Sequence, residues 1–287
     1  MIVKQRTFPR LGLYSTLAFL LVAASVARAE ILVPQLMGAI AFNSETRTNP
    51  PQRLFVAQVD LTNPRVHLRV SPGGPDPDGL GKWQTTLLEP TKIAAREKFD
   101  FVINGDFFTA KGVNDGEGTN SHFRAEQWAR VAGPAVTDGH VWSTATNARP
   151  CLVVHKKGKA SIEMLVRPAT GDWEVISGNV LLLHNGQIVT HESKARHPRT
   201  VVGLNADQTR LTVLVVDGRK PGVAQGMTYD DLAAEMLRLG CSEAFNLDGG
   251  GSSVMAVRDG TGQLKILNVP TDGRERAVAD VLGISVE

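Results

Sequence analysis

The residues best suited to chemistry lie in one loop near the end of the chain, Asn246-Leu247-Asp248-Gly249-Gly250-Gly251-Ser252-Ser253. Three consecutive glycines let the backbone turn tightly and expose successive N–H groups, which can cradle an anionic oxygen. A carboxylate precedes this turn and two hydroxyls follow it. The loop therefore predicts a catalytic Asp248 beside a bound anion. The predicted binding residues of the loop are Asn246, Gly249, Gly250, Gly251, Ser252 and Ser253.

Two further carboxylates follow apolar runs in the same way. Asp106 comes after Val102-Ile103-Asn104-Gly105, and Asp217 comes after Val215-Val216. An isolated Asp-Gly pair is most simply a turn. Three aspartates at comparable strand ends, two of them in Asp-Gly pairs, instead indicate a shared site, because open α/β sheets bind ligands at the carboxyl ends of their strands. Asp106 and Asp217 are therefore catalytic candidates together with Asp248, and Asn104 is a binding candidate.

Arginines stand in similar positions beside predicted strands. They are Arg199, Arg219 and Arg276, and together with Thr200, which follows Arg199, they are candidate substrate-binding residues. A guanidinium group matches phosphate or carboxylate in two-point geometry, although ordinary surface ion pairing with the acids is the simpler alternative. Carboxylates, arginines and a glycine cradle together suit an anionic ester whose reacting carbon needs a negative partner. A glycosyl phosphate is such an ester.

These residues need a scaffold, and hydrophobic periodicity predicts a mixed α+β fold made largely of β-hairpins. Hairpins are expected at 136–142, 151–166 and 180–190, and strands at 53–60 and 66–70 around a turn at Asn63-Pro64. Helices are expected at 91–98 and 228–239, the second with a capping box from Thr228 and Asp231. The strand 211–216, the second helix and the strand 244–247 are interpreted as a parallel βαβ crossover. Residues 30–52 are interpreted as a polar lead-in.

The N-terminus has the pattern of a signal peptide. Lys4, Arg6 and Arg10 precede an apolar stretch over 11–25, and Ala27-Arg28-Ala29 fits a cleavage site. We expect export to the periplasm or the exterior, removal of 1–29, and no stable membrane span afterwards; an uncleaved anchor is the alternative. Residues 30–94, with N-terminal strands and a loop, and residues 95–287 are expected to form one globular unit.

Composition limits the classes of partner and cofactor that the protein is expected to bind. The formal net charge is +2 and the basic residues are scattered, which argues against nucleic-acid binding. Cys151 and Cys241 are the only cysteines, and buried thiols are favoured over a disulfide between them. Without HExxH or CxxC motifs, no zinc site and no cofactor are expected. Bound Mg²⁺ or Ca²⁺ at Asp106, Asp217 and Asp248 remains an alternative.

Several short motifs occur in one order: 104–108, 199–203, 216–219, 225–228, 246–253 and 268–276. Together they resemble the phosphodiester glycosidase family, with the likeness covering roughly residues 95–287. The resemblance implies hydrolysis of a sugar–phosphate diester at the anomeric carbon through an oxocarbenium-like transition state. It suggests that Asp248 or Asp217 stabilises or attacks that carbon while the other orients water or acts as base.

The same resemblance suggests that Arg199, Arg219 and the glycine amides hold phosphate, and that Asn104, Asp106 and Ser252 hold sugar hydroxyls or phosphate oxygens. The expected substrate lies in an envelope or extracellular glycan. One alternative is a non-catalytic glycan-binding or exopolysaccharide-assembly protein, with tryptophans such as Trp83 and Trp173 stacking on sugars. The other alternative is a metal-dependent phosphodiesterase.

Overall fold

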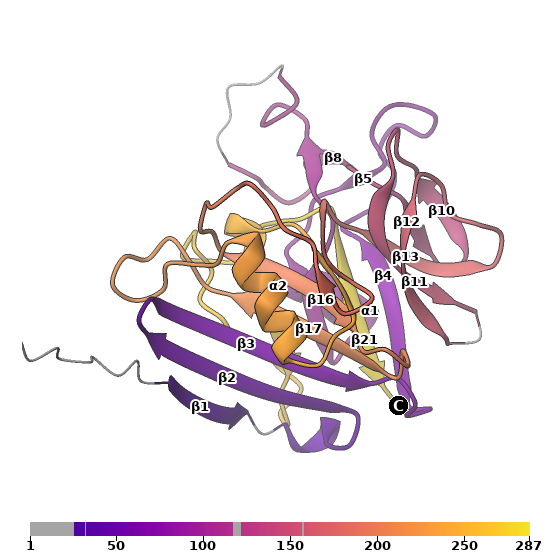
Figure 1. The fold of residues 1–287 in the computed structure, drawn as a ribbon. Helices are drawn as coiled ribbons and strands as arrows, with labels where there is room; N and C mark the ends of the chain where they lie inside the picture. Colours follow the sequence, from indigo (N-terminus) through magenta and orange to yellow (C-terminus); the bar gives the residue numbers. More distant parts are fainter. Residues whose placement is uncertain (1–25, 32, 117–121, 157) are drawn as a thin grey trace, which may run out of the picture.

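The computed structural model describes residues 26–31, 33–116, 122–156 and 158–287. These residues form four antiparallel sheets and two α-helices (Figure 1). The largest sheet has the strand order β1 (Val26–Ile31), β2 (Ile40–Thr48), β3 (Pro51–Asp60), β17 (Arg210–Val216), β16 (Arg199–Leu204), β18 (Glu243–Asn246), β14 (Val180–His184) and β15 (Gln187–Ile188).

Two five-stranded sheets and one small sheet complete the β-structure. One contains, in order, β10 (His140–Ser143), β9 (Ala135–Thr137), β13 (Asp172–Ser177), β11 (Arg149–His155) and β12 (Ala160–Leu165). The next contains β20 (Leu264–Ile266), β19 (Met255–Arg258), β6 (Phe101–Asn104), β21 (Asp280–Val286) and β4 (Val66–Pro72). The small sheet contains β5 (Thr85–Thr86), β8 (Trp128–Val131) and β7 (Phe108–Ala110).

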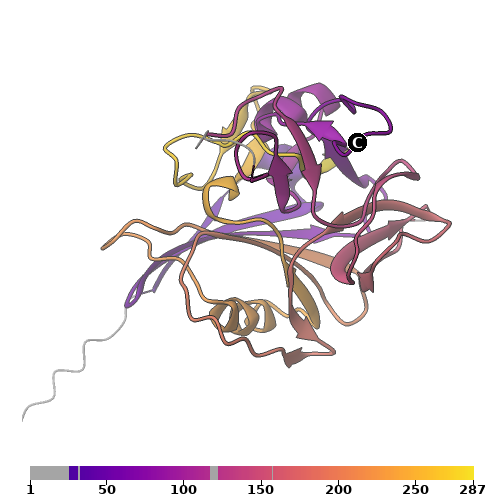
Figure 2. The same cartoon turned by 90° about the horizontal axis from the view of Figure 1, so that it is seen from above.

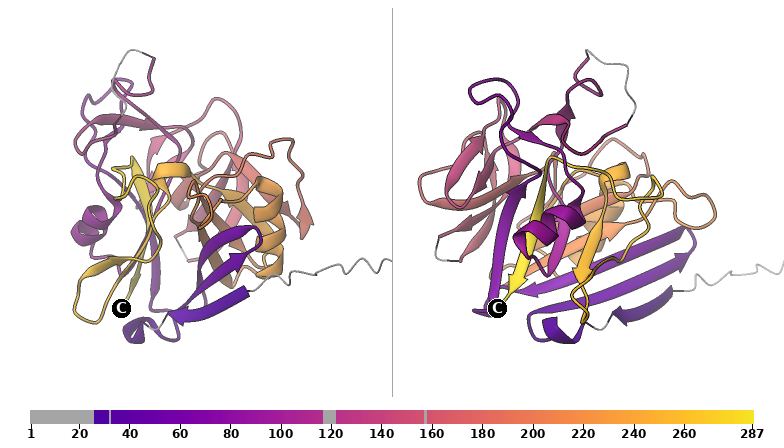
Figure 3. Two further views of the ribbon diagram at one scale, coloured as in Figure 1. Left: turned by 90° about the vertical axis from the view of Figure 1, so that its left-hand side faces the viewer. Right: turned by 180° about the vertical axis from the view of Figure 1, so that it is seen from behind.

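The sheets pack in layers around the eight-stranded sheet. Helix α2 (Tyr229–Arg238) covers one face of it through Leu232 and Met236 (Figure 2). The other face packs against the two five-stranded sheets in one continuous core, in which the rings of Phe42 and Phe101 meet edge to face 5.4 Å apart. Helix α1 (Pro90–Glu97) lies against the far face of the β6–β21 sheet (Figure 3). Two short 3₁₀ segments are η1 (Pro34–Leu36) and η2 (Gly250–Ser252).

The expected α+β fold with a parallel βαβ crossover is wrong. Strand β16 lies between β17 and β18 and pairs antiparallel with both, so the two strands joined through α2 are not neighbours. All six residues of β16 are buried. A strand that is apolar on both faces can occupy the middle of a sheet, and its sequence does not identify its neighbours. β17 and β18 still run in the same direction, since each opposes β16.

Several local predictions are confirmed, and two others are wrong. The three hairpins form as β9–β10, β11–β12 and β14–β15, and the Thr228–Asp231 capping box begins α2. The predicted lead-in over 30–52 instead contains η1, β2 and the start of β3. The strands at 53–60 and 66–70 do not pair with each other, because β3 pairs with β2 and β17 whereas β4 pairs with β21.

The expected signal peptide lies mostly outside the described residues, and its cleavage site falls within β1. In the described part of the chain, no helix is long and apolar enough to span a membrane. Cys151 and Cys241 are free and buried, so the alternative of a disulfide between them does not hold.

Candidate active site

The site forms where β6, β16, β18 and β21 bring strand ends together, and Asn104 at the end of β6 ties them to the glycine loop. Its side-chain amide donates a hydrogen bond to the Asp248 carbonyl at 2.8 Å. Its Oδ1 accepts hydrogen bonds from the Thr200 hydroxyl at 2.7 Å and from the Val254 N–H at 3.2 Å. Asn104 and Thr200 are fully buried. They therefore fix the loop rather than face a ligand.

Asp106 lies beside a second buried carboxyl, that of Asp280. The Asp106 N–H donates to Asp280 Oδ1 at 2.8 Å, while the Ser177 N–H donates to Asp106 Oδ2 at 3.1 Å. The Ser177 hydroxyl also contacts Asp106 Oδ1 closely. Burial raises the pKa of both carboxyls, with that of Asp280 reaching about 7, and the neighbouring Asp280 raises that of Asp106 further.

Asp248 is the catalytic candidate with partial access to solvent. Its N–H donates to the Gly105 carbonyl at 3.0 Å, and its Oδ1 accepts the Gly249 N–H at 2.8 Å. Burial raises the pKa of Asp248 to about 6, opposed by the Ser252 hydroxyl, the Gly249 N–H and the charges of Arg276 and Arg219. A carboxyl with such a pKa is ionised near neutrality and can accept a proton below it.

Two guanidinium groups pack closely against the glycine loop. A Cβ at Gly250, where φ is +63°, would lie 3.1 Å from both terminal nitrogens of Arg219. A Cβ at Gly251 would lie 2.0 Å from Nη2 of Arg276, which also donates to Asp272 at 2.8 Å. The glycines are therefore required for this close approach. Their positions place both cations within electrostatic reach of Asp248.

Arg199 brings a third cation to the other side of the loop. It is buried, stacks on the Tyr229 ring at 4.1 Å, and makes long hydrogen bonds of 3.4 Å to the carbonyls of Met227 and Ala195. Among the described residues, no carboxylate forms an ion pair with it. Burial and the charges of Arg199 and Arg219 lower the pKa of His197, which keeps that ring neutral near pH 7.

Asp217 accepts its hydrogen bonds from the segment that follows β20. It accepts hydrogen bonds from the Val269 N–H at 3.0 Å and from the Asn268 amide at 3.3 Å, and burial raises its pKa. Asn268 also donates to the Ser253 carbonyl at 3.1 Å. In this geometry Asp217 supports the segment that leads to Arg276.

The remaining loop residues form the buried base of the site. Asn246 donates to Asn179 Oδ1 at 2.9 Å, and Ser252 and Ser253 are 1% and 2% exposed. A cavity of about 530 Å³ opens beside Arg276. Its other lining side chains include Glu89, Phe123, Arg274 and Glu275.

The sequence reasoning missed Asp280, Ser177 and Tyr229. Asp280 had a usable signal, because it is the single acidic residue in the otherwise apolar run Ala277-Val278-Ala279-Asp280-Val281-Leu282. Acids in such runs are rare unless they are paired or functional. Within the described ranges, no group of three or more acidic, His or Cys side chains is arranged to hold a metal ion.

Fold and site together define a β-rich protein with a carboxylate and arginine centre. The sequence profile of the phosphodiester glycosidase family matches residues 97–285. The chain therefore belongs to the phosphodiester glycosidase family, as the motifs suggested.

Similar proteins agree with this assignment. The fold matches the zebrafish N-acetylglucosamine-1-phosphodiester alpha-N-acetylglucosaminidase catalytic domain, auto-inhibited by its pro-peptide, with a TM-score of 0.60 and 20% identity over 92% of this chain and 83% of that one. It also matches a candidate exported protein from Burkholderia pseudomallei, with a TM-score of 0.58 and 17% identity over 82% and 74% of the two chains.

A shorter stretch resembles the SPbeta prophage-derived uncharacterized protein YomE of Bacillus subtilis. The two are 44% identical over 90 residues, which cover 31% of this chain and 13% of that protein. The chain thus spans a small part of this curated relative.

Proposed function

We propose that the protein is an exported hydrolase that cleaves a glycosyl-1-phosphodiester bond in an envelope or extracellular glycan. The observation that carries the proposal is the position of Asp248. This partly exposed carboxylate ends β18 beside the glycine loop, with Arg219 and Arg276 against the same loop. The family, and the substrate class in the name of the zebrafish enzyme, supply the reaction type.

Asp248 is the residue proposed to face the anomeric carbon. As that carbon develops positive charge, the carboxylate stabilises it or attacks it. Its surroundings favour this role, since it is ionised above a pKa of about 6. Asp217 and Asp106 both accept hydrogen bonds from neighbouring N–H groups. We therefore assign Asp217 a positioning role and assign Asp106 the role of supporting Asp248.

The phosphate is proposed to bind between the guanidinium groups. Arg219 and Arg276 flank the loop on which the Gly249–Gly251 amides lie, and Arg199 adds a buried positive charge without an acidic ion-pair partner among the described residues. A phosphate leaving group is already anionic and departs readily. The site therefore needs charge stabilisation more than a strong general acid.

Export is part of the same proposal. It is supported by the signal-like N-terminus and by the similarity to a candidate exported protein. A periplasmic or extracellular location would place the enzyme beside envelope glycans.

A matched substrate pair tests the reaction. The purified protein is incubated with an α- or β-glycosyl-1-phosphodiester and, separately, with a phosphodiester of similar size that lacks an anomeric carbon. Release of free sugar and phosphomonoester from the first substrate alone is the expected result. Binding of the glycosyl phosphodiester without turnover would favour a glycan-binding protein, and cleavage of both substrates would favour a phosphodiesterase.

A further inference from the structure

The pair Asp106–Asp280 is unusual because two carboxyls share one buried space. Asp106 is 2% exposed and Asp280 is fully buried. The printed sequence separates them by 174 residues, and the pairing of β6 with β21 brings them together. In the part of the chain that the structure describes, no Lys, Arg or His side chain forms an ion pair with either carboxyl. Two such charges in an apolar interior would be very costly.

The two carboxyls of the pair do not receive the same number of hydrogen bonds. Asp106 receives the Ser177 N–H and hydroxyl, whereas Asp280 Oδ1 receives the Asp106 N–H and Asp280 Oδ2 has no hydrogen-bond partner among the described residues. An orphaned, fully buried carboxyl oxygen next to a second carboxyl is the arrangement in which one proton bridges two acids.

Other titratable and charged groups lie close to the pair. Asp248 is close enough for its charge to raise the pKa of Asp280, and the charge of Asp106 raises the pKa of the buried Cys151 thiol. On the other side of Ser177 lies Arg149, whose guanidinium donates to the Gly178 carbonyl. Asp248 is thus the partly exposed acid whose charge acts on the pair.

We propose that Asp106 and Asp280 hold a single proton between them near neutral pH, and that this shared proton limits the negative charge beside Asp248. With one proton, the pair carries one negative charge instead of two. Asp248 can then remain ionised beside it. The role assigned to Asp248 rests on the proposed function, but the shared proton does not.

The test is an NMR titration of protein labelled with ¹³C at the aspartate carboxyls, with Asp248 assigned from Asp248→Asn. In the wild type, one carboxyl should stay protonated near neutral pH and titrate with the coupled behaviour of a pair. In Asp280→Asn, the remaining Asp106 has several donors and should be ionised. In Asp248→Asn, the titration of the pair should move to lower pH by about one unit, because a neighbouring like charge is gone.

Two further variants keep the result decisive. Asp106→Asn should replace the coupled titration by that of a single buried carboxyl, Asp280, which covers the case in which Asp280→Asn does not fold. Asp207→Asn removes an exposed carboxylate far from the pair and should leave both titrations unchanged. Full ionisation of all wild-type aspartates near neutrality would overturn the shared proton. An unmoved titration of the pair in Asp248→Asn would overturn the link between the pair and Asp248. Both readouts are independent of turnover, so an inactive wild-type protein would count against the proposed function alone.

Discussion

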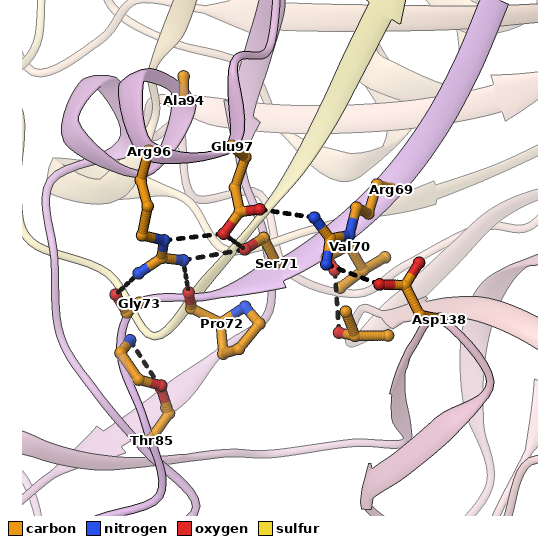
Figure 4. Close-up of polar contacts among 12 residues, drawn as sticks. Arg69, Val70, Ser71, Pro72, Gly73, Thr85, Ala94, Arg96, Glu97 and Asp138 are labelled. Atoms are coloured by element: carbon orange, nitrogen blue, oxygen red, sulfur yellow. Dashed lines mark hydrogen bonds and ion pairs between the residues drawn. The ribbon is translucent and has the colours of Figure 1, made fainter.

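Two regions of this molecule treat their carboxylates in opposite ways. Figure 4 shows the first region, the arginine network, which consists of Arg69, Ser71, Arg96, Glu97 and Asp138 and joins β4, α1 and the β9–β10 turn. Arg69 donates to Glu97 at 2.6 Å and to Asp138 at 2.6 Å, while Arg96 donates to Glu97 at 2.8 Å. The second region is the pair Asp106–Asp280, with no such cation in the described residues.

The two regions shift the pKa values of their acids in opposite directions. Burial alone would raise the pKa of Glu97, but the hydrogen bonds from Arg96 and Ser71 and the charge of Arg69 outweigh it and lower the pKa. At the site, burial and the neighbouring acid raise the pKa values of Asp106 and Asp280. The arginine network therefore holds elements together. The pair stores a proton at some expense of stability, which is typical of functional sites.

The largest expected effect is on turnover in Asp248→Asn. Removing the carboxylate that we propose to face the anomeric carbon should lower kcat by about a thousandfold, within the range for a single catalytic group. Turnover of the glycosyl-1-phosphodiester is compared with that of Asp138→Asn from the arginine network. Near wild-type rates in a folded Asp248→Asn variant would contradict the catalytic role assigned to Asp248.

A smaller effect is expected at the arginines, and it separates the two regions. Arg219→Ala should reduce kcat/KM by about tenfold to a hundredfold, the value of one charged hydrogen bond to phosphate. Arg69→Ala should leave kcat/KM unchanged and instead lower the free energy of unfolding by about 1 kcal/mol. Equal losses of kcat/KM in both variants would show that the comparison is mistaken.

The pH dependence of stability should have opposite signs in the two regions. Glu97 has a lowered pKa, so its contribution is present above its ordinary value and is lost as the pH falls through its folded pKa. Asp280 has a raised pKa, so stability is lost as the pH rises from about 4 to about 7.

Urea unfolding at a series of pH values measures both slopes. Relative to wild type, Asp280→Asn should lose less stability over that upper range, whereas Glu97→Gln should lose less as the pH falls below about 4. Parallel slopes in wild type and Asp280→Asn would contradict the raised pKa of Asp280.

The smallest expected effect is that of EDTA. None of the proposed steps uses a metal ion, so dialysis against EDTA should leave kcat within about twofold, the scatter common to such assays. A loss of activity that Mg²⁺ or Ca²⁺ restores would instead favour the metal-dependent alternative.

The sequence predicted the parts of the site that are local. The glycine loop, Asn104 and Asp106 stand in short motifs next to apolar strands, and the three hairpins follow from their turn residues. The contact between Asp106 and Asp280 depends on the pairing of β6 with β21, and turn chemistry carries no information on that register. The position of β16 between β17 and β18 was missed for a related reason, since its fully buried residues suit any central strand.

The central claim is attack at the anomeric carbon, and hydrolysis in water labelled with heavy oxygen tests it most directly. Mass spectrometry of the products shows which bond was cleaved. The account predicts that the label enters the released sugar and that the phosphomonoester carries none. Label in the phosphate would mean attack at phosphorus, and would contradict a glycosidase mechanism at Asp248.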